Sequence, residues 1–418
     1  MEHPKILFVG IDIALNKFDV EYLDIFSNSF SNKKNRLFNN SPEGVDSFVD
    51  FIITIAKEND FNKVLIGFES TGNYGFHLPF VLSENEELKS FNPVIYQINP
   101  KIIKNFRKSY NDIPKTDSQD AFIIAERLKN SRLMPFTRFD PHYFALKTLT
   151  RSRFSLVMKM VSEKARFISL LFIKASAFTQ TKIFSNILCN TGSSLLTEFN
   201  SVDEIANMDI NEMVKFIILK SKNHFKDPET LAKQIQDVAK ESYKISKVLH
   251  DPVSYSLMAS FNHIKYLKGE IQILEKEISK LIPTFQNQYN ILTSIKGIGF
   301  VLASGIIAEL GDLSDFKSQD KVAKFSGLVW SIKDSGKFKS EEKHLTKTGN
   351  KFLRYYLVEA AQCLVSFNSD FTPYFQNKFN QGVKRKYKRA LLFVARKFVR
   401  VIFCLLKNNK LYVSPKTK

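Results

Sequence analysis

The sequence predicts an α/β domain at the N-terminal end of the chain, followed by a mainly helical remainder. Within the first 130 or so residues, strand patterns come first as a hairpin and then alternate with helix patterns, which is typical of a mixed sheet covered by helices. A heptad repeat of apolar residues and a glycine-tight turn between two helical patterns follow. We therefore expect a central helical coiled-coil region and a C-terminal, mainly helical domain with a helix-hairpin-helix-like element.

Five segments of the N-terminal domain are expected to be strands. In chain order they are ILFVGID (6–12), FDVEYLD (18–24), RLFNN (36–40), KVLIGFE (63–69) and PVIYQIN (93–99). The second alternates apolar and polar residues, as the hairpin partner of the first would. Helices are expected over residues 43–58, briefly after Gly72, and from Pro100 onward. This order is similar to that of a ribonuclease-H-like fold.

Four acidic residues stand where such a domain could gather them. Asp12 and Glu69 end two buried strands, and Asp117 and Asp120 open a predicted helix. Each acid alone is more simply a strand-end turn residue or a helix cap. Clustered carboxylates repel one another, so their joint placement indicates a pair of divalent cations. Oxygen ligands of this kind suit Mg²⁺, with Mn²⁺ as the alternative, and two-metal carboxylate sites serve phosphodiester chemistry.

The charge balance favours nucleic acid as a partner. The 418 residues include 61 Lys or Arg and 42 Asp or Glu, a net charge of +19, which attracts polyanions regardless of their sequence. No apolar run reaches the roughly 18 residues of a membrane span, and the N-terminus lacks a signal-peptide pattern. Three distant cysteines form neither a disulfide framework nor a zinc site. A cytoplasmic protein, associated with the nucleoid when bound to DNA, is expected.

The chain from about residue 141 to 283 reads as helical. Within it, residues 264–281 place apolar side chains 3, 4, 3, 4 and 3 positions apart, a heptad seam that indicates a coiled coil or helical hairpin. The helix over about 142–176 is its expected partner. Residues 180–255 carry no recognisable chemistry and are interpreted as a spacer or subunit-contact region.

Two features of the C-terminal region favour contact with DNA phosphates. Gly297 and Gly299 lie in the turn of the helix-hairpin-helix-like element, where backbone amides and the next helix N-terminus can hold a phosphate. Residues 383–418 hold twelve Lys or Arg and no Asp or Glu, on a helix with one apolar stripe. The opposite face, with Lys384, Arg385 and Lys388, is free to bind phosphates. A glycine-tight turn also occurs in proteins that never meet nucleic acid.

A serine in GLVWSIKDSGKF (327–338) is a candidate nucleophile. Ser335 is followed by Lys337, Lys347 and Arg354, and a serine that attacks a phosphate needs nearby cations to offset charge. A simple turn is the plainer interpretation, and Ser331 in the same segment is an alternative nucleophile.

The chain resembles insertion-sequence transposases that combine a RuvC-like DEDD domain with a C-terminal serine-bearing domain, the bridge-RNA-guided recombinases. The matching segments are GIDIALNKFDV, GFESTGNY, INPKIIKNF, K-x-D-x-x-D-A-x-x-I-A, IKGIGFVLASGIIAELGDLSDF, KFSGLV, DSGKF and LTKTGNKFLRYYLVEAA. By this resemblance Asp12, Glu69, Asp117 and Asp120 hold the metal and Ser335 is the nucleophile. It also implies donor and target DNA, a non-coding guide RNA, and homodimers or homotetramers.

Three residues depart from the family pattern. The nearest lysine after Asp12 is Lys17, later than usual, Trp330 stands where proline is frequent, and the acid Asp334 precedes Ser335. Asp334 could repel the scissile phosphate, accept a proton or bind metal.

The resulting hypothesis is a DNA transposase or recombinase with three regions. Residues 1–140 form the RuvC-like DEDD domain, 141–285 the helical spacer, and 286–418 the serine-bearing DNA-binding domain. One alternative is a RuvC-like junction-resolving nuclease that uses metal-activated water, which would not need Ser335. Another is a catalytically silent nucleic-acid-binding protein, against which the four gathered acids argue.

Overall fold

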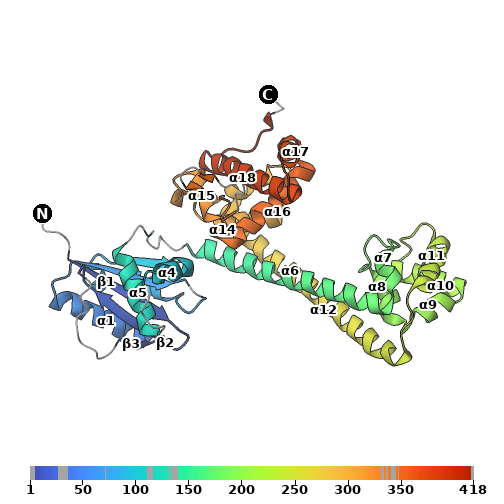
Figure 1. Cartoon of the computed structure of the whole chain (residues 1–418), viewed down its shortest axis with the longest axis horizontal. Coiled ribbons are helices and arrows are strands. Elements are labelled where there is room, and N and C mark those ends of the chain that lie inside the picture. The colour runs from blue at the N-terminus through green and yellow to red at the C-terminus, as the bar shows by residue number, and fades with distance from the viewer. Residues whose placement is uncertain are drawn as a thin grey trace. The chain divides into compact units, whose positions relative to one another are not determined.

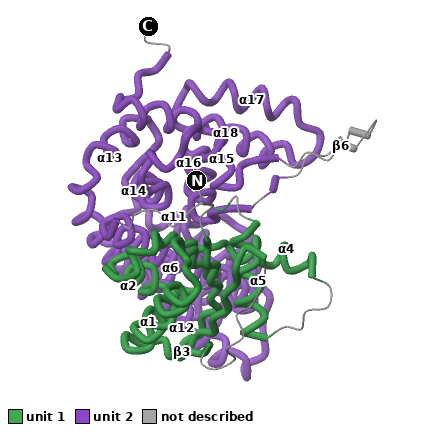
Figure 2. The backbone as a smooth tube through the Cα atoms, turned by 90° about the vertical axis from the view of Figure 1, so that its left-hand side faces the viewer, with its two compact units in different colours: residues 1–139 green, residues 140–418 purple. Residues whose placement is uncertain are grey.

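The computed structural model divides into two compact units, residues 1–139 and 140–418 (Figure 2). It describes residues 5–26, 36–70, 72–110, 116–130, 133, 140–330, 334–335, 338–339, 345–346 and 348–415. No helix in these ranges is both long and apolar enough to cross a membrane.

The first unit is a five-stranded mixed sheet with helices, as the sequence predicts. Its strands are β1 (Ile6–Ile13), β2 (Lys17–Leu23), β3 (Leu37–Asn39), β4 (Lys63–Glu69) and β5 (Val94–Ile98), in the spatial order β3-β2-β1-β4-β5. The pairs β1–β2 and β2–β3 are antiparallel, whereas β1–β4 and β4–β5 are parallel. Its helices are α1 (Pro42–Glu58), α2 (Leu78–Glu84), α3 (Glu86–Lys89), α4 (Pro100–Arg107) and α5 (Asp117–Lys129) (Figure 1).

The two faces of this sheet have separate cores because side chains alternate along each strand. Leu7, Val9 and Ile11 pack on one face against residues of α1, such as Phe48. On the other face, Phe8 and its neighbours pack against α4 and α5. The sheet is therefore a middle layer between α1 and the α4–α5 pair.

Helix α5 approaches the sheet unusually closely. A Cβ on Gly10 of β1 would lie 2.0 Å from the carbonyl oxygen of Ala121 and 2.4 Å from the amide nitrogen of Ala125. Only a residue without a side chain fits there. Two small residues on the helix and a glycine on the strand thus let the start of α5 lie directly against the sheet.

The second unit is mainly helical in its described residues. Its helices are α6 (Pro141–Lys174), α7 (Ser176–Gln180), α8 (Asn190–Glu198), α9 (Val202–Asn207), α10 (Ile210–Ser221), α11 (Pro228–Glu241), α12 (Lys247–Leu281), η1 (Ile282–Phe285), α13 (Gln286–Thr293), α14 (Phe300–Leu310), η2 (Leu313–Asp315), α15 (Gln319–Phe325), α16 (Lys351–Phe367), α17 (Thr372–Asn380) and α18 (Lys386–Lys407). Two short strands, β6 (Asp334–Ser335) and β7 (Phe338–Lys339), pair antiparallel.

The long helices α6 and α12 pack against each other and connect two hydrophobic cores (Figure 1). Ile264, Leu267, Ile271 and Ile278 of the predicted seam are buried. One core joins the ends of α6 and α12 to α7–α11. The other joins Leu146 of α6 and Ile278 of α12 to the helices from α13 to α18. The pairing of the two long helices is observed, and their coiled-coil geometry stays a prediction.

Candidate functional site

Asp12 and Glu69 lie side by side at the ends of two neighbouring parallel strands. The last pair in the β1–β4 register is Ile11 with Phe68, so the next residues on the two strands are the two acids. Adjacent strands lie about 4.8 Å apart. Side chains alternate between the two faces along a strand, so Asp12 lies on the same face as Phe8, and Glu69 on the same face as Leu65. Phe8 and Leu65 pack on the face that α4 and α5 cover.

Asp117 and Asp120 occupy the first turn of α5, whose start lies over this same edge. The Oγ1 atom of Thr116 accepts a hydrogen bond from the Gln119 amide at 3.3 Å, which caps the helix. Ala121, the residue after Asp120, is in contact with Gly10, two residues before Asp12. The structure thus assembles the elements that carry all four acids on one face of the sheet.

Basic side chains pair with the two acids of α5. The Nζ atom of Lys17 lies 3.9 Å from a carboxylate oxygen of Asp117. Arg107, at the end of α4, forms an ion pair with Asp120. These cations offset part of the repulsion between neighbouring carboxylates.

A fifth acid, Asp19, belongs to this cluster and is absent from the set chosen from the sequence. It stands opposite Asp12 in the β1–β2 register, and opposite residues point to the same face. Lys17 lies 3.9 Å from its carboxylate. Burial raises the pKa of the Asp19 carboxyl, Lys17 lowers it, and Asp117 raises it. The sequence contained one signal for it: in the predicted hairpin of residues 6–12 and 18–24, Asp19 lies near the start of the second strand, opposite the end of the first strand.

The donor set suits a hard divalent ion in its chemistry, because all of its ligands are carboxylate oxygens. Within the described ranges, however, no three Asp, Glu, His or Cys side chains are close enough to hold a metal ion. The acids are gathered on one face, but two of them are paired with the protein's own cations.

The candidate nucleophile lies in the second unit, in the β6–β7 hairpin. Ser335 is opposite Phe338 in that pairing. The structure describes only the backbone of Asp334 and Ser335, and Ser331, Lys337 and Lys347 lie outside the described residues.

The serine segment, residues 326–350, connects α15 to α16, and backbone hydrogen bonds join its two ends. Trp330 and Leu345 form an antiparallel β-bridge, and the Thr346 amide donates a hydrogen bond to the Val329 carbonyl at 2.8 Å. Further on, the Asn350 amide donates to the Phe325 carbonyl at 2.6 Å. The chain entering the hairpin and the chain leaving it are therefore joined to each other, and Val329 and Leu345 also pack against the helical core.

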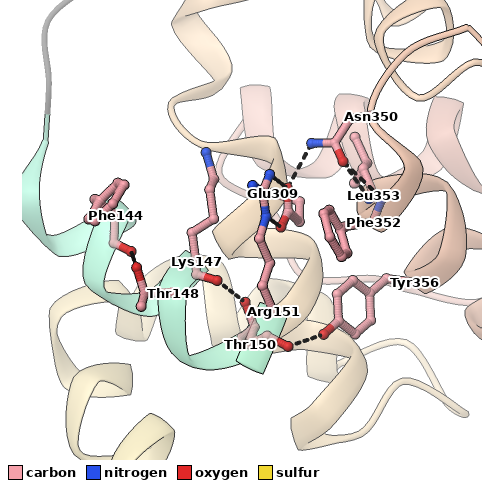
Figure 3. Close-up of polar contacts among 10 residues, drawn as sticks. All are labelled: Phe144, Lys147, Thr148, Thr150, Arg151, Glu309, Asn350, Phe352, Leu353 and Tyr356. Atoms are coloured by element: carbon pink, nitrogen blue, oxygen red, sulfur yellow. Dashed lines mark hydrogen bonds and ion pairs between the residues drawn. The ribbon is translucent and has the colours of Figure 1, made fainter. Parts of the chain in front are cut away.

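An ion pair between a half-exposed arginine and a buried carboxylate lies at the end of this segment (Figure 3). Glu309 of α14 is buried and accepts hydrogen bonds from Nε and Nη2 of Arg151 at 2.7 and 2.9 Å. It also accepts one from Nδ2 of Asn350 at 2.7 Å. The Oδ1 atom of Asn350 in turn accepts hydrogen bonds from the amides of Phe352 and Leu353, both at 3.0 Å, and so caps α16.

Two more basic groups lie in this part of the structure. Burial lowers the pKa of the Lys147 ammonium, while Glu309 raises it. Arg354, a predicted phosphate contact, donates to the Ser326 carbonyl at 3.0 Å, and burial lowers its pKa. One nitrogen of the Arg354 guanidinium is therefore engaged in a hydrogen bond within the protein. Sequence reasoning missed Glu309, whose signal was an acid within the apolar run of residues 300–310.

The remaining predicted phosphate contacts lie in two places. Gly297, with a φ of +102°, and the exposed Gly299 form the turn between α13 and α14. Lys384, Arg385 and Lys388 are exposed at the start of α18, and Arg385 has a φ of +49°.

Comparisons with known proteins match both ends of the chain. A DEDD transposase model named for IS110 matches residues 9–173, and a model described as "Transposase IS116/IS110/IS902 family" matches residues 289–376. The insertion element IS116 protein of Streptomyces clavuligerus is 23% identical over 76% of this chain and 77% of its own length. The insertion element IS900 protein of Mycobacterium paratuberculosis is 24% identical over 73% and 74%. A pilin gene-inverting protein of Moraxella bovis is 26% identical over 36% of this chain and 47% of its own length.

Proposed function

Since the chain is an insertion-sequence transposase, an enzyme that cleaves DNA and transfers its strands, we propose that it does so with two chemical centres. One is the acid cluster of Asp12, Glu69, Asp117 and Asp120. The other is the hydroxyl of Ser335. The observation that supports the proposal is the close approach of α5 to β1 at Gly10, because it brings the helix turn that carries Asp117 and Asp120 to the face of the sheet that carries Asp12 and Glu69.

The acid cluster binds divalent metal, Mg²⁺ or Mn²⁺, in this proposal. The matched DEDD domain supports metal dependence, and the all-carboxylate donor set agrees with it. When bound, the metal supplies positive charge at the scissile phosphate. Lys17 and Arg107 form ion pairs with Asp117 and Asp120.

Ser335 attacks the phosphorus of the scissile phosphodiester. The bond between its Oγ and phosphorus forms while the bond to the leaving DNA oxygen breaks. The hydroxyl proton of Ser335 passes to a carboxylate or to water, and the leaving oxygen takes up a proton, so no net proton is gained or lost. The resulting serine ester keeps the phosphodiester energy, so a hydroxyl of a second strand can reseal the break and release the serine. A serine hydroxyl needs activation for this attack, which a carboxylate of the acid cluster or its bound metal would supply in the assembled complex.

DNA and a non-coding guide RNA are the proposed partners, and a homodimer or homotetramer is the proposed assembly. The net charge of +19 supports polyanion binding. Gly297 and Gly299 would present amides to a phosphate, as a helix-hairpin-helix does. Lys337, Lys347, Arg354, Lys384, Arg385 and Lys388 would contact phosphates. We also propose that the first unit is RuvC-like, a variant of the ribonuclease-H-like fold. The paired helices α6 and α12 form a coiled coil in this proposal. The protein associates with the nucleoid when it is bound to DNA.

The experiment that tests the chemistry traps the intermediate. A DNA substrate that loses its leaving strand after cleavage should leave an adduct on Ser335, located by peptide mapping. Ser335→Ala should form none and should still bind DNA and RNA. An adduct on Ser331 or on a tyrosine would refute the assignment. Cleavage with no adduct would instead identify a RuvC-like nuclease that uses water.

A further inference from the structure

Aromatic and basic side chains contact one another next to the chain segment that carries Ser335. We call this set the ladder; its members are Trp330, Phe371, Tyr374, Lys378, Arg389, Phe393 and Lys397. Trp330 stacks on Phe393 of α18, with ring centroids 4.7 Å apart and planes 17° from parallel. The guanidinium carbon of Arg389 lies 5.1 Å from the Phe393 centroid, and Nζ of Lys378 lies 5.4 Å from it. Two cations therefore contact the Phe393 ring, which itself stacks on Trp330.

The ladder continues onto α17, which packs beside α18 (Figure 1). Lys378 also lies 5.8 Å from the ring centroid of Tyr374. Lys397 lies 4.8 Å from Tyr374 and 5.2 Å from Phe371. Rings and cations thus alternate from Phe393 to Tyr374, and the series ends at Phe371, which is buried and directly precedes α17.

The positive charge of the ladder is not neutralised by carboxylates that the structure describes. No Asp or Glu follows Asp370 in the sequence. Among the described residues, Lys378, Arg389 and Lys397 have no ion pair, whereas Arg396 of the same helix pairs with Asp320. A cation over a ring keeps its charge, so this surface combines charge for phosphate with rings for a base.

The ladder is also close to the proposed nucleophile along the chain. Trp330 precedes Ser335 by five residues, and five extended residues span at most about 17 Å. This upper limit corresponds to about five base steps of duplex DNA. Trp330 is held at the base of the hairpin by its bridge to Leu345.

We propose that the ladder binds an unpaired nucleotide of the DNA strand flanking the cut. The base stacks on the Trp330–Phe393 pair, and the neighbouring phosphates contact Arg389 and Lys378. This inference rests on the proposed function, because it takes Ser335 as the cleavage site. Strand exchange must pass through unpaired nucleotides, and stacking on aromatic rings holds such nucleotides whatever their sequence.

Trp330 is the single tryptophan of the chain, so intrinsic tryptophan fluorescence of the whole protein reports on this site alone. We expect a decamer of thymidine deoxynucleotides to quench it at saturation. An abasic decamer with the same phosphates should bind but not quench. Equal quenching by both probes would overturn the proposal, because it would trace the signal to phosphate binding. A uridine ribodecamer that bound and quenched more strongly would reassign the ladder to RNA and would equally overturn it.

Two substitutions test the ladder directly. Trp330→Ala should weaken binding of the thymidine decamer about tenfold and leave the abasic decamer unaffected; unchanged affinity for both would refute stacking. Arg389→Met keeps the stacked rings and should weaken the binding of both decamers. It should also reduce the slope of log affinity against log salt concentration by about one, because one phosphate contact is lost. Arg400→Met is the matched control, since Arg400 is an exposed residue of the same helix. Equal effects of Arg389→Met and Arg400→Met would also refute the ladder.

The outcome is separable from that of the nucleophile assignment. Fluorescence quenching requires no cleavage and can be measured with Ser335→Ala. Quenching without a trapped adduct would overturn only the role of Ser335. An adduct on Ser335 without base-dependent quenching would overturn only the ladder.

Discussion

Gly10 and Ala121 are in such close contact that a Cβ on Gly10 would lie 2.0 Å from the Ala121 carbonyl oxygen. This contact joins β1, which carries Asp12, to α5, which carries Asp117 and Asp120. The packing of one glycine thus determines how close the acids of the strand and the helix can come.

Gly10→Ala should therefore push α5 away from the sheet. Overpacking of this kind costs about 1–3 kcal/mol or more, and we expect lower protection of the β1 and α5 amides in hydrogen exchange, together with weaker Mg²⁺ binding. Gly269→Ala is the control, because a Cβ there meets nothing within 4 Å. Equal protection in Gly10→Ala and wild type would contradict the packing argument.

The four acids should be needed for recombination but not for folding. Asp12→Ala, Glu69→Ala and Asp120→Ala should each abolish strand exchange and weaken Mg²⁺ binding measured by calorimetry. Asp46→Ala, an exposed acid of α1, should change neither. Wild-type recombination rates in two of the three variants would show that the metal assignment is wrong.

The Arg151–Glu309 pair should stabilise the second unit. Arg151→Met removes the two hydrogen bonds that the guanidinium donates to the buried Glu309 carboxylate, which should cost about 1–3 kcal/mol in chemical denaturation. Adding Glu309→Gln removes the stranded charge and retains an acceptor for Asn350, so part of the stability should be recovered. Lys280→Met, which breaks an exposed pair with Glu277, should cost under about 1 kcal/mol. A double variant less stable than Arg151→Met would contradict this account.

Lys174 should make stability depend on pH. Its Nζ donates to the carbonyls of Leu196 and Phe199, and burial lowers its pKa to about 8. Between about pH 8 and its ordinary value of 10.5, the unfolded chain then binds more protons than the folded one, so the Lys174 contribution rises with pH. The free energy of unfolding of wild type minus that of Lys174→Met should grow by about 1–3 kcal/mol across this window. A constant difference would refute the lowered pKa.

The basic residues at the start of α18 should bind phosphates without reading sequence. Reversing the charge of Lys384, Arg385 and Lys388 should weaken DNA binding to the same extent for all DNA sequences. The slope of log affinity against log salt concentration should fall by about one for each phosphate that is no longer neutralised. Reversal at Lys215, Lys265 and Lys268, exposed lysines of α10 and α12, is the charge-matched control. Identical salt slopes for the two triple variants would exclude α18 from the interface.

Much of the first unit could be predicted because its signals are local. Unbroken apolar runs became β1 and β4, and the cap at Thr116 begins α5 directly before Asp117. The position of Asp12 and Glu69 at strand ends also follows from the pattern. Strand ends and helix starts depend on a few consecutive residues, so a single sequence contains the information.

Local patterns were thus enough to establish the mixed α/β class, the long helices, the basic tail and the family resemblance. They were not enough to show that Asp19 joins the acids, that Lys17 and Arg107 pair with Asp117 and Asp120, or that Glu309 holds Asn350; those facts come from the folded chain. Each of them depends on register or on contacts between residues far apart in the chain. Such contacts depend on how whole elements pack, and a close approach like that of Gly10 to Ala121 leaves no periodic pattern in the sequence.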